Sequence, residues 1–239
     1  MSIDADELSA SLRRLAAKGP TDSDTGVLAA LQEVNDACVD IFGVTGSGIM
    51  VADEQDITHY VSASDGPGRY LEQAESATGQ GPCTEAFVEN RVVDTVDVTV
   101  DERWPELAAR MRGRGVRAVL GVPVHIGAIP VGTLDAYHDR THAWDEDERR
   151  ALERYSAVVE TVLTAALRAH SASELAGQLQ YALDYRVTIE RAVGFLMATG
   201  GVDAVIAFNR LRRAARNRQV KIGVVAEHVL TAGRLPSSG

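Results

Sequence analysis

The hydrophobic periodicity of this chain changes near Asp145, and that change limits the folds that the sequence can adopt. Before Asp145, short runs rich in β-branched residues, such as 92–98 and 117–125, are separated by turns that contain Gly or Asp. After it, apolar residues recur every three or four positions, as they do on one face of a helix. The sequence therefore predicts an α+β body that is followed by an all-helical end.

The body has the pattern of a mostly antiparallel sheet with helices on its faces. Residues 47–62 predict one β-hairpin around the polar turn at 53–55, and residues 117–138 predict a second around Gly127. Helical patterns precede the first hairpin and also lie between the two hairpins, where the run 92–98 predicts a further strand. This order of elements is typical of a single antiparallel sheet that is covered by helices.

A long helix is predicted from residue 145 to about residue 193. Asp145 and Glu148 have the spacing of a capping box, in which each side chain accepts a hydrogen bond from the other's backbone N–H. Five apolar residues then follow with the spacing of a coiled-coil seam: Leu152, Tyr155, Val159, Val162 and Ala166. The phase shifts at 171–173, which indicates a joint between two helices or a stutter in one. The seam either packs on the sheet of its own domain or forms a homodimer through the helix at 145–193.

Charge is distributed unevenly along the chain, whose net charge is −10. Residues 171–239 carry nine Lys or Arg and five Asp or Glu, a net charge of +4, whereas residues 1–170 carry −14. An acidic body does not attract nucleic acid, but a basic end can. The two parts are therefore expected to have different partners.

The cysteines and histidines have no spacing that is typical of a metal site. Cys38 and Cys83 are far apart, and no C-x-x-C pair or Cys/His cluster is present. We interpret Asp135, His138 and Asp139 as a strand end with the turn that follows it, rather than as a metal site. We therefore expect reduced thiols and no bound metal.

The leader and the apolar runs indicate no membrane partner. The first twenty residues lack a continuous apolar core, so we expect no secretory signal. The apolar stretch 157–167 is too short to cross a bilayer. These features predict a cytoplasmic protein.

An ordered residue pattern runs across three predicted helices at the C-terminal end. It comprises Ala182-Leu183, Arg186, Ile189-Glu190, Ala192, Gly194, Leu196-Met197, Ala207-Phe208, Leu211-Arg212, Ala215 and Val225-Ala226. With this pattern, residues 175–231 resemble the ANTAR domain, a small three-helix RNA-binding antitermination module. The resemblance implies RNA hairpin loops as partners and places Gly194 on the RNA face. One departure is Val193, where many family members have Lys, so a positive charge beside Gly194 is missing.

A second set of motifs lies in the body. It comprises Gly79-Gln80-Gly81-Pro82-Cys83, Asp101-Glu102-Arg103-Trp104-Pro105, 115–120, Val122-Pro123-Val124 and Val131-Gly132-Thr133-Leu134. With these motifs, residues 27–168 resemble the GAF family, a widespread small-molecule sensor fold. The resemblance implies a ligand pocket between the sheet and its covering helices, and the candidate lining residues are Cys83, Trp104, His125 and Tyr137. The cofactor or small-molecule effector is unknown from the sequence.

The candidate RNA-binding residues combine basic and small side chains. They are Arg186, Ala192, Gly194, Arg212, Arg216, Arg218 and Lys221. Arg212 and Arg216 are four positions apart and so share one side of a helix. Arginine can pair with phosphate and stack on a base, and a small residue such as Gly194 lets a nucleotide approach the backbone. The alternatives are a solvated basic face and, for Gly194, tight packing between helices.

The predicted organisation is a leader helix at 1–20, a GAF-like sensor at 21–170, an ANTAR-like RNA-binding domain at 171–232 and a flexible tail at 233–239. No nucleophile or acid/base pair stands out, so we expect no catalytic residues and no enzyme. The resemblances imply a signal-responsive transcription antitermination regulator of the actinobacterial type. Its GAF-like domain would sense a small molecule or a redox signal, and its ANTAR-like domain would bind hairpin RNA in nascent transcripts as a dimer. The alternative is a ligand-responsive dimerisation or protein-interaction module that does not bind RNA directly.

Overall fold

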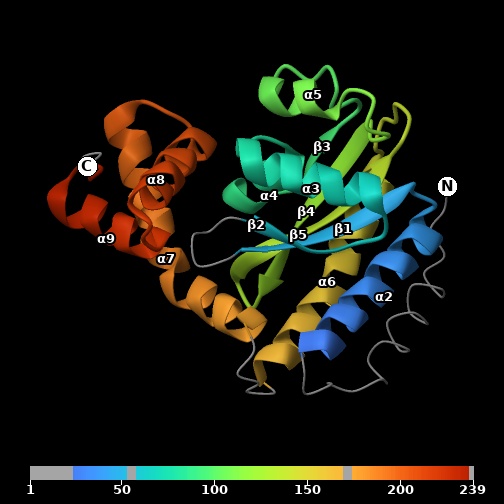
Figure 1. Ribbon diagram of the computed structural model, residues 1–239, viewed down its shortest axis with the longest axis horizontal. Coiled ribbons are helices and arrows are strands. Elements are labelled where there is room, and N and C mark those ends of the chain that lie inside the picture. The colour runs from blue at the N-terminus through green and yellow to red at the C-terminus, as the bar shows by residue number, and fades with distance from the viewer. Residues whose placement is uncertain (1–23, 53–57, 169–173, 237–239) are drawn as a thin grey trace.

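The computed structural model describes residues 24–52, 58–168 and 174–236. A five-stranded sheet with helices on both faces forms the larger part, and three C-terminal helices form a module at one end of it (Figure 1). This is the α+β arrangement that the change of periodicity predicts. The leader predicted at 1–20, the joint at 171–173 and the last three residues of the tail lie outside the described residues.

The sheet has the order β2-β1-β5-β4-β3, and each neighbouring pair is antiparallel. Its strands are β1 (Gly46–Ala52), β2 (Thr58–Ala63), β3 (Val93–Thr95), β4 (Ala118–Ile126) and β5 (Ile129–His138). Both predicted hairpins are present, as β1–β2 and β4–β5. The strand predicted at 92–98 is shorter, because the Asp97 carboxylate accepts hydrogen bonds from the backbone N–H and the hydroxyl of Thr99 and turns the chain.

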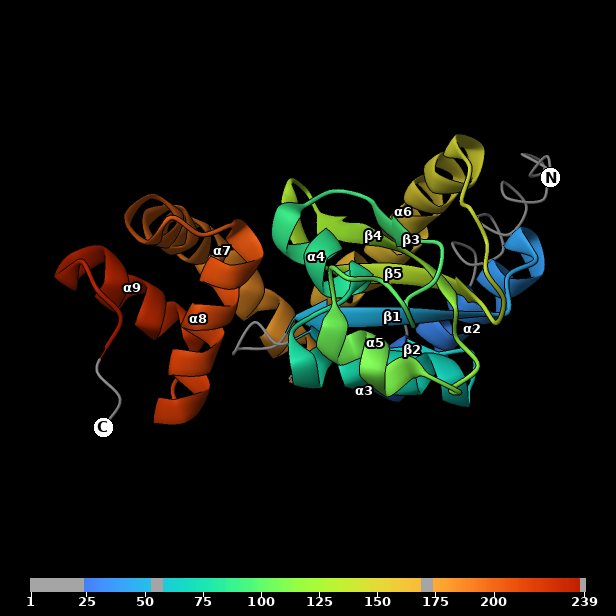
Figure 2. The same cartoon turned by 90° about the horizontal axis from the view of Figure 1, so that it is seen from above.

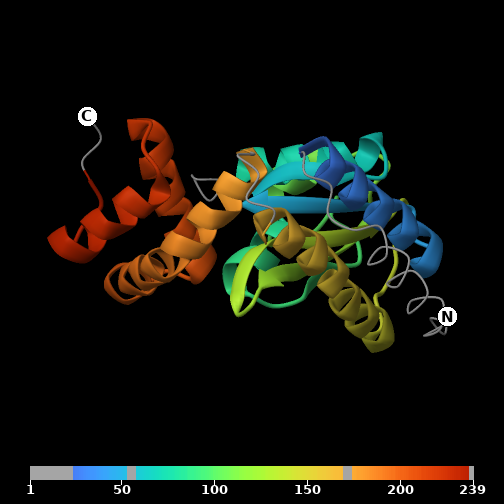
Figure 3. The same ribbon diagram turned by 90° about the horizontal axis from the view of Figure 1, so that it is seen from below.

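Helices α2 (Asp24–Phe42) and α6 (Glu146–Arg168) cover one face of the sheet and lie side by side (Figure 3). The predicted capping box starts α6, since Asp145 Oδ1 accepts from the N–H of Glu148 and Glu148 Oε2 accepts from the N–H of Asp145. The predicted seam of α6 is buried against the sheet and α2, and Tyr155 also donates to the carbonyl oxygen of Val34. The seam therefore packs within its own domain, and a dimer through 145–193 would have to use other faces of the helices.

Three further helices cover the opposite face: α3 (Gly66–Thr78), α4 (Pro82–Glu89) and α5 (Pro105–Met111). In Figure 2, α3 and α5 lie on one side of the sheet and α6 on the other. Asp65 caps α3 by accepting from the N–H of Gly68, 2.8 Å away. Gly79 ends α3 with a φ of 67°, a conformation that side chains other than glycine rarely adopt. The chain then turns directly into α4.

The C-terminal module consists of α7 (Glu174–Gly200), α8 (Ala204–Arg218) and α9 (Ile222–Ala232). Helices α6 and α7 lie on either side of the predicted joint or stutter at 171–173, which falls outside the described residues. Gly223 lets α9 approach α7 closely, because its N–H donates to the Tyr181 hydroxyl and an added Cβ would lie 2.5 Å from the Tyr185 ring. Among the described residues, no single helix has the length and apolarity to cross a membrane, although the bent α7–α8 pair meets both criteria when taken together.

Candidate functional site

The turn between α3 and α4 is held by two side chains of α8. Asn209 Nδ2 donates to the carbonyl oxygen of Gly79 at 2.9 Å, and Arg212 Nη2 donates to the carbonyl oxygen of Ser76 at 3.1 Å. A Cβ added to Gly79 would lie 2.4 Å from Asn209 Oδ1 and 2.9 Å from Arg212 Nη2. Gly79 is therefore needed both for the turn and for the close approach of the helical module.

A second set of contacts joins α4 to the helical module through Phe87. Arg186 of α7 donates from Nη2 to the carbonyl oxygen of Phe87 at 3.1 Å, and its guanidinium lies 4.4 Å from the centre of the Phe87 ring. The ring also meets Phe208 of α8 edge to face, with the centroids 6.2 Å apart. An aromatic contact and a cation–π contact thus fix the end of α4 between α7 and α8.

These contacts divide the predicted RNA-binding residues into a buried group and a group at the surface. Arg186 and Arg212 are only 4% and 6% exposed, since both lie between the two domains. Ala192 is fully buried in the core of the helical module, where it packs with Phe208 and Leu211. In this arrangement, none of the three presents its side chain to a nucleic acid.

The rest of the predicted RNA-binding set lies at the surface. Arg216 and Arg218 are exposed on the last turn of α8, and Lys221 is half-buried with its ammonium 4.7 Å from the centre of the Tyr181 ring. Gly194 is exposed on α7, and an added Cβ would meet no atom within 4 Å. Tight helix packing, the alternative for Gly194, is therefore absent from this structure, and the glycine is open to a ligand.

Next to these contacts, a basic cleft lies between α8 and the sensor domain. Its volume is about 380 Å³, and the module side is lined by Arg210, Arg212, Arg213 and Arg216 together with Asn209 and Asn217. Thr78, Gln80 and Glu106 line the sensor side. Arg212 and Arg216 share one side of α8, as their spacing predicts, but the set predicted from the sequence lacks Asn209, Arg210 and Arg213. The sequence signal for these residues was the high density of arginine in α8.

Three of the four predicted pocket residues of the sensor lie together. Cys83, Trp104 and Tyr137 are buried in one apolar cluster beneath α3, α4 and α5. His125 does not join them, because it lies near the far end of β4, half-exposed, with its Nε2 2.6 Å from Asn90 Oδ1. The prediction that His125 lies with the other three residues is therefore wrong in the structure.

Beside Cys83 lies a group of buried acids that the set predicted from the sequence lacks. Glu72 and Glu75 of α3 and Asp135 of β5 are each at most 2% exposed. Burial, together with the charge of Glu75, raises the pKa of Asp135 to about 8, and burial raises the pKa of Glu75 to about 7. Burial and the neighbouring Asp135 and Glu75 also hold the pKa of Glu72 well above its usual range.

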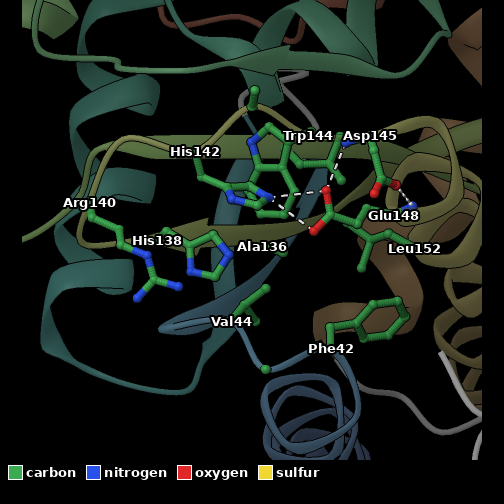
Figure 4. Close-up of a pocket in the computed structure, with 13 residues that line it drawn as sticks. Phe42, Val44, Ala136, His138, Arg140, His142, Trp144, Asp145, Glu148 and Leu152 are labelled. Carbon is green, nitrogen blue, oxygen red and sulfur yellow. Dashed lines mark hydrogen bonds and ion pairs between the residues drawn. The ribbon is translucent and has the colours of Figure 1, made fainter. Parts of the chain in front are cut away.

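A separate aromatic pocket of about 220 Å³ lies at the other face of the sheet, between the end of α2 and the start of α6 (Figure 4). The His138 ring stacks on Trp144 with a centroid distance of 5.2 Å, and His142 contacts both rings. His142 Nε2 lies 2.9 Å from Glu148 Oε1. Burial, followed by the nearby His142, lowers the pKa of His138.

Family models match both parts of the chain. A GAF domain model matches residues 27–163, so the chain belongs to the GAF domain family. An ANTAR domain model matches residues 177–230. The chain is thus a GAF and ANTAR domain-containing regulator, in which the GAF domain precedes the ANTAR domain.

Solved structures share the sensor fold at low sequence identity. The free methionine-R-sulfoxide reductase from Neisseria meningitidis is 17% identical with a TM-score of 0.52, and the match covers 68% of this chain and 89% of that chain. The GAF domain from Acinetobacter phosphoenolpyruvate-protein phosphotransferase is 16% identical with a TM-score of 0.49, covering 66% and 94%. The cyanobacteriochrome TePixJ GAF domain is 21% identical with a TM-score of 0.47, covering 60% and 90%. No curated protein matches the chain.

Proposed function

We propose that this chain is an antitermination regulator whose sensor domain controls RNA binding by holding α8 against the α3–α4 turn. The observation that carries the proposal is the placement of Arg212, which is buried on the sensor while Arg216, one turn along the same face, is exposed. Bound in this way, the arginine-rich face of α8 borders a cleft that is too small for an RNA hairpin. Separation of the two domains would present the basic residues of α8 that line the cleft as one surface, namely Arg210, Arg212, Arg213 and Arg216.

The RNA surface combines this basic face with the open glycine of α7. Arginine suits a hairpin, because its planar guanidinium pairs with phosphate in two places and stacks on unpaired bases. Gly194 adds a place where the RNA backbone can approach the helix closely. We expect two chains to bind paired hairpins as a homodimer, and the nascent transcript places the protein in the cytoplasm.

The input is a small molecule or ion bound by the sensor, and the chain performs no catalysis. Supporting this part of the proposal, Cys38 lies on α2 and Cys83 on α4, and these helices cover opposite faces of the sheet, so the two cysteines do not form a dithiol pair. This distinguishes the chain chemically from an enzyme that cycles between a dithiol and a disulfide.

The test compares two charge reversals of equal size in the full chain. Arg216→Glu changes the proposed RNA surface, whereas Arg154→Glu changes an exposed arginine of α6 in the sensor. Binding to a fluorescent RNA hairpin should weaken at least about tenfold for Arg216→Glu and change little for Arg154→Glu, because a phosphate contact is lost only in the first. Equal binding by both variants would favour the alternative of a protein-interaction module.

A further inference from the structure

The centre of the sheet carries a buried carboxylate between two glycines. Asp135 of β5 lies opposite Gly48 of β1 and Gly121 of β4, so the three residues face the same side. A Cβ added to Gly48 would lie 2.3 Å from Glu72 Oε1, and one added to Gly121 would lie 3.2 Å from Asp135 Oδ1. The two glycines therefore leave the space that the acidic side chains occupy.

Three elements bring potential metal ligands into this space. Glu72 comes from α3, Cys83 from the first turn of α4 and Asp135 from β5, and one ligand atom of each lies within 4.8 Å of the others. All three residues are buried. Glu75 lies next to them but is already engaged, because its oxygens accept from the backbone N–H groups of Cys83 and Thr84 at 3.3 and 2.8 Å.

Two carboxylate oxygens in the group have no hydrogen-bond partner. Glu72 Oε2 and Asp135 Oδ1 are both buried, and in the described part of the chain neither oxygen has a hydrogen-bond partner, although the Glu72 and Asp135 carboxyl groups share one hydrogen bond when one of them is protonated. Among the same residues, neither acid forms an ion pair. An ionised carboxylate in such surroundings is costly unless a cation or a donor compensates it. The raised pKa of Asp135 has the same cause, namely the burial of several acids without a positive charge.

We propose that Glu72, Cys83 and Asp135 bind a divalent transition-metal ion of the Zn²⁺ and Fe²⁺ class. The thiolate of Cys83 selects against Mg²⁺ and Ca²⁺, which prefer ligands that are all oxygen, while Glu72 and Asp135 supply charge and two oxygens. Binding replaces the protons of the thiol and the carboxyl groups, which leave to solvent. Three protein ligands leave a coordination position for a small molecule or water, as in other open metal sites.

The position of this site links it to the interface between the domains. Cys83 and Thr84 at the start of α4 are bonded to Glu75, which lies one residue before Ser76, the residue bound by Arg212. Occupation of the site would act on the same α3–α4 segment that holds α8. This regulatory consequence rests on the proposed function, whereas the metal site itself does not.

The experiment titrates the full chain, first stripped of metal with a chelator, with Zn²⁺ alone and with Co²⁺ alone. We expect one ion per chain and, with Co²⁺, a thiolate-to-cobalt charge-transfer band in the near ultraviolet. Cys83→Ser should abolish the band, and the matched variant Cys38→Ser, which changes the other buried cysteine, should retain it. Asp135→Asn, which preserves shape, should weaken Zn²⁺ binding at least about tenfold.

Circular dichroism of each variant verifies that it is folded before the metal is added. Absence of stoichiometric binding by the folded wild-type chain would overturn the proposal, and so would a cobalt band that survives Cys83→Ser. Hairpin binding by the metal-free chain is measured separately, so failure of the metal site is distinguished from failure of the proposed RNA-binding function.

Discussion

Arg212 of α8 donates a hydrogen bond from Nη2 to the carbonyl oxygen of Ser76 in α3, 3.1 Å away. Through this bond, one of the residues that the sequence suggests for RNA binding is attached to the sensor domain. A buried charged donor that loses its hydrogen-bond acceptor costs free energy, so the bond also contributes to the stability of the whole chain. The interface between α8 and the sensor domain therefore stabilises the fold, and by our proposal it also controls RNA binding.

Arg212→Ala should lower the free energy of unfolding of the full chain by about 1.5–3 kcal/mol, the usual contribution of a hydrogen bond to a charged group. Arg213→Ala, at the next position but exposed, should change it by less than about 0.5 kcal/mol. Urea denaturation followed by circular dichroism measures both. Equal losses for the two variants would show that Arg212 does not hold the domains together.

Gly194→Ala should change stability and RNA binding in opposite directions: the protein should become more stable and should bind the hairpin more weakly. The added methyl group meets no neighbour, and alanine favours the helix over glycine by about 0.5–1 kcal/mol, so the melting temperature should rise. Hairpin affinity should fall, because the methyl group occupies the place where the RNA backbone approaches α7. A stabilised variant with unchanged RNA affinity would remove Gly194 from the RNA surface.

The buried acids predict how stability depends on pH in the metal-free protein. In the folded chain, Asp135 and Glu75 titrate with pKa values of about 8 and about 7, and the pKa values of Glu72 and Cys83 also lie above their usual ranges. The three carboxyls of the folded state thus retain protons that the unfolded chain releases near pH 4, whereas a cysteine thiol of the unfolded chain titrates only near pH 8.5 and does not contribute in this range. The buried carboxyls stabilise the fold fully below about pH 4, and that contribution is lost as the pH rises toward about 8, by at most about 1.4 kcal/mol per pH unit for each carboxyl.

Asp135→Asn should reduce this slope, since the amide does not titrate. Urea denaturation in the presence of a chelator, between about pH 5 and pH 8, measures the slope for the wild type and for the variant. Asp139→Asn serves as the control, because Asp139 is exposed just beyond the end of β5. A slope that Asp135→Asn and Asp139→Asn leave equally unchanged would contradict the assignment to the buried group.

The fold was largely predictable because periodicity and capping are local properties. The capping box of Asp145 and Glu148, both hairpins and the three C-terminal helices are present as expected. The strand at 92–98 is shorter because a single side chain, Asp97, competes with the ladder for backbone hydrogen bonds. Such competition is hard to foresee from β-branched composition alone.

The site was less predictable, because it depends on contacts between distant segments. Nothing local distinguishes Arg212, which is buried on Ser76, from Arg216, which is exposed at i+4. The alternation of side chains along β5 places Asp135 and His138 on opposite faces of the sheet, so these two neighbours in sequence do not share a site. For Asp135, the partners Glu72 and Cys83 come from helices whose packing on the sheet no local pattern reveals.

The most direct test of sensor control measures RNA hairpin affinity of the full chain after Gly79→Ala. This change lies in the sensor, leaves the proposed RNA surface intact and forces a Cβ to within 2.4 Å of Asn209 Oδ1. Gly113→Ala is the control, because Gly113 also has a positive φ, of 72°, but has no neighbour within 4 Å of an added Cβ. We predict that Gly79→Ala binds the hairpin at least about fivefold more tightly than Gly113→Ala. Equal or weaker binding by Gly79→Ala would contradict control of α8 by the α3–α4 turn.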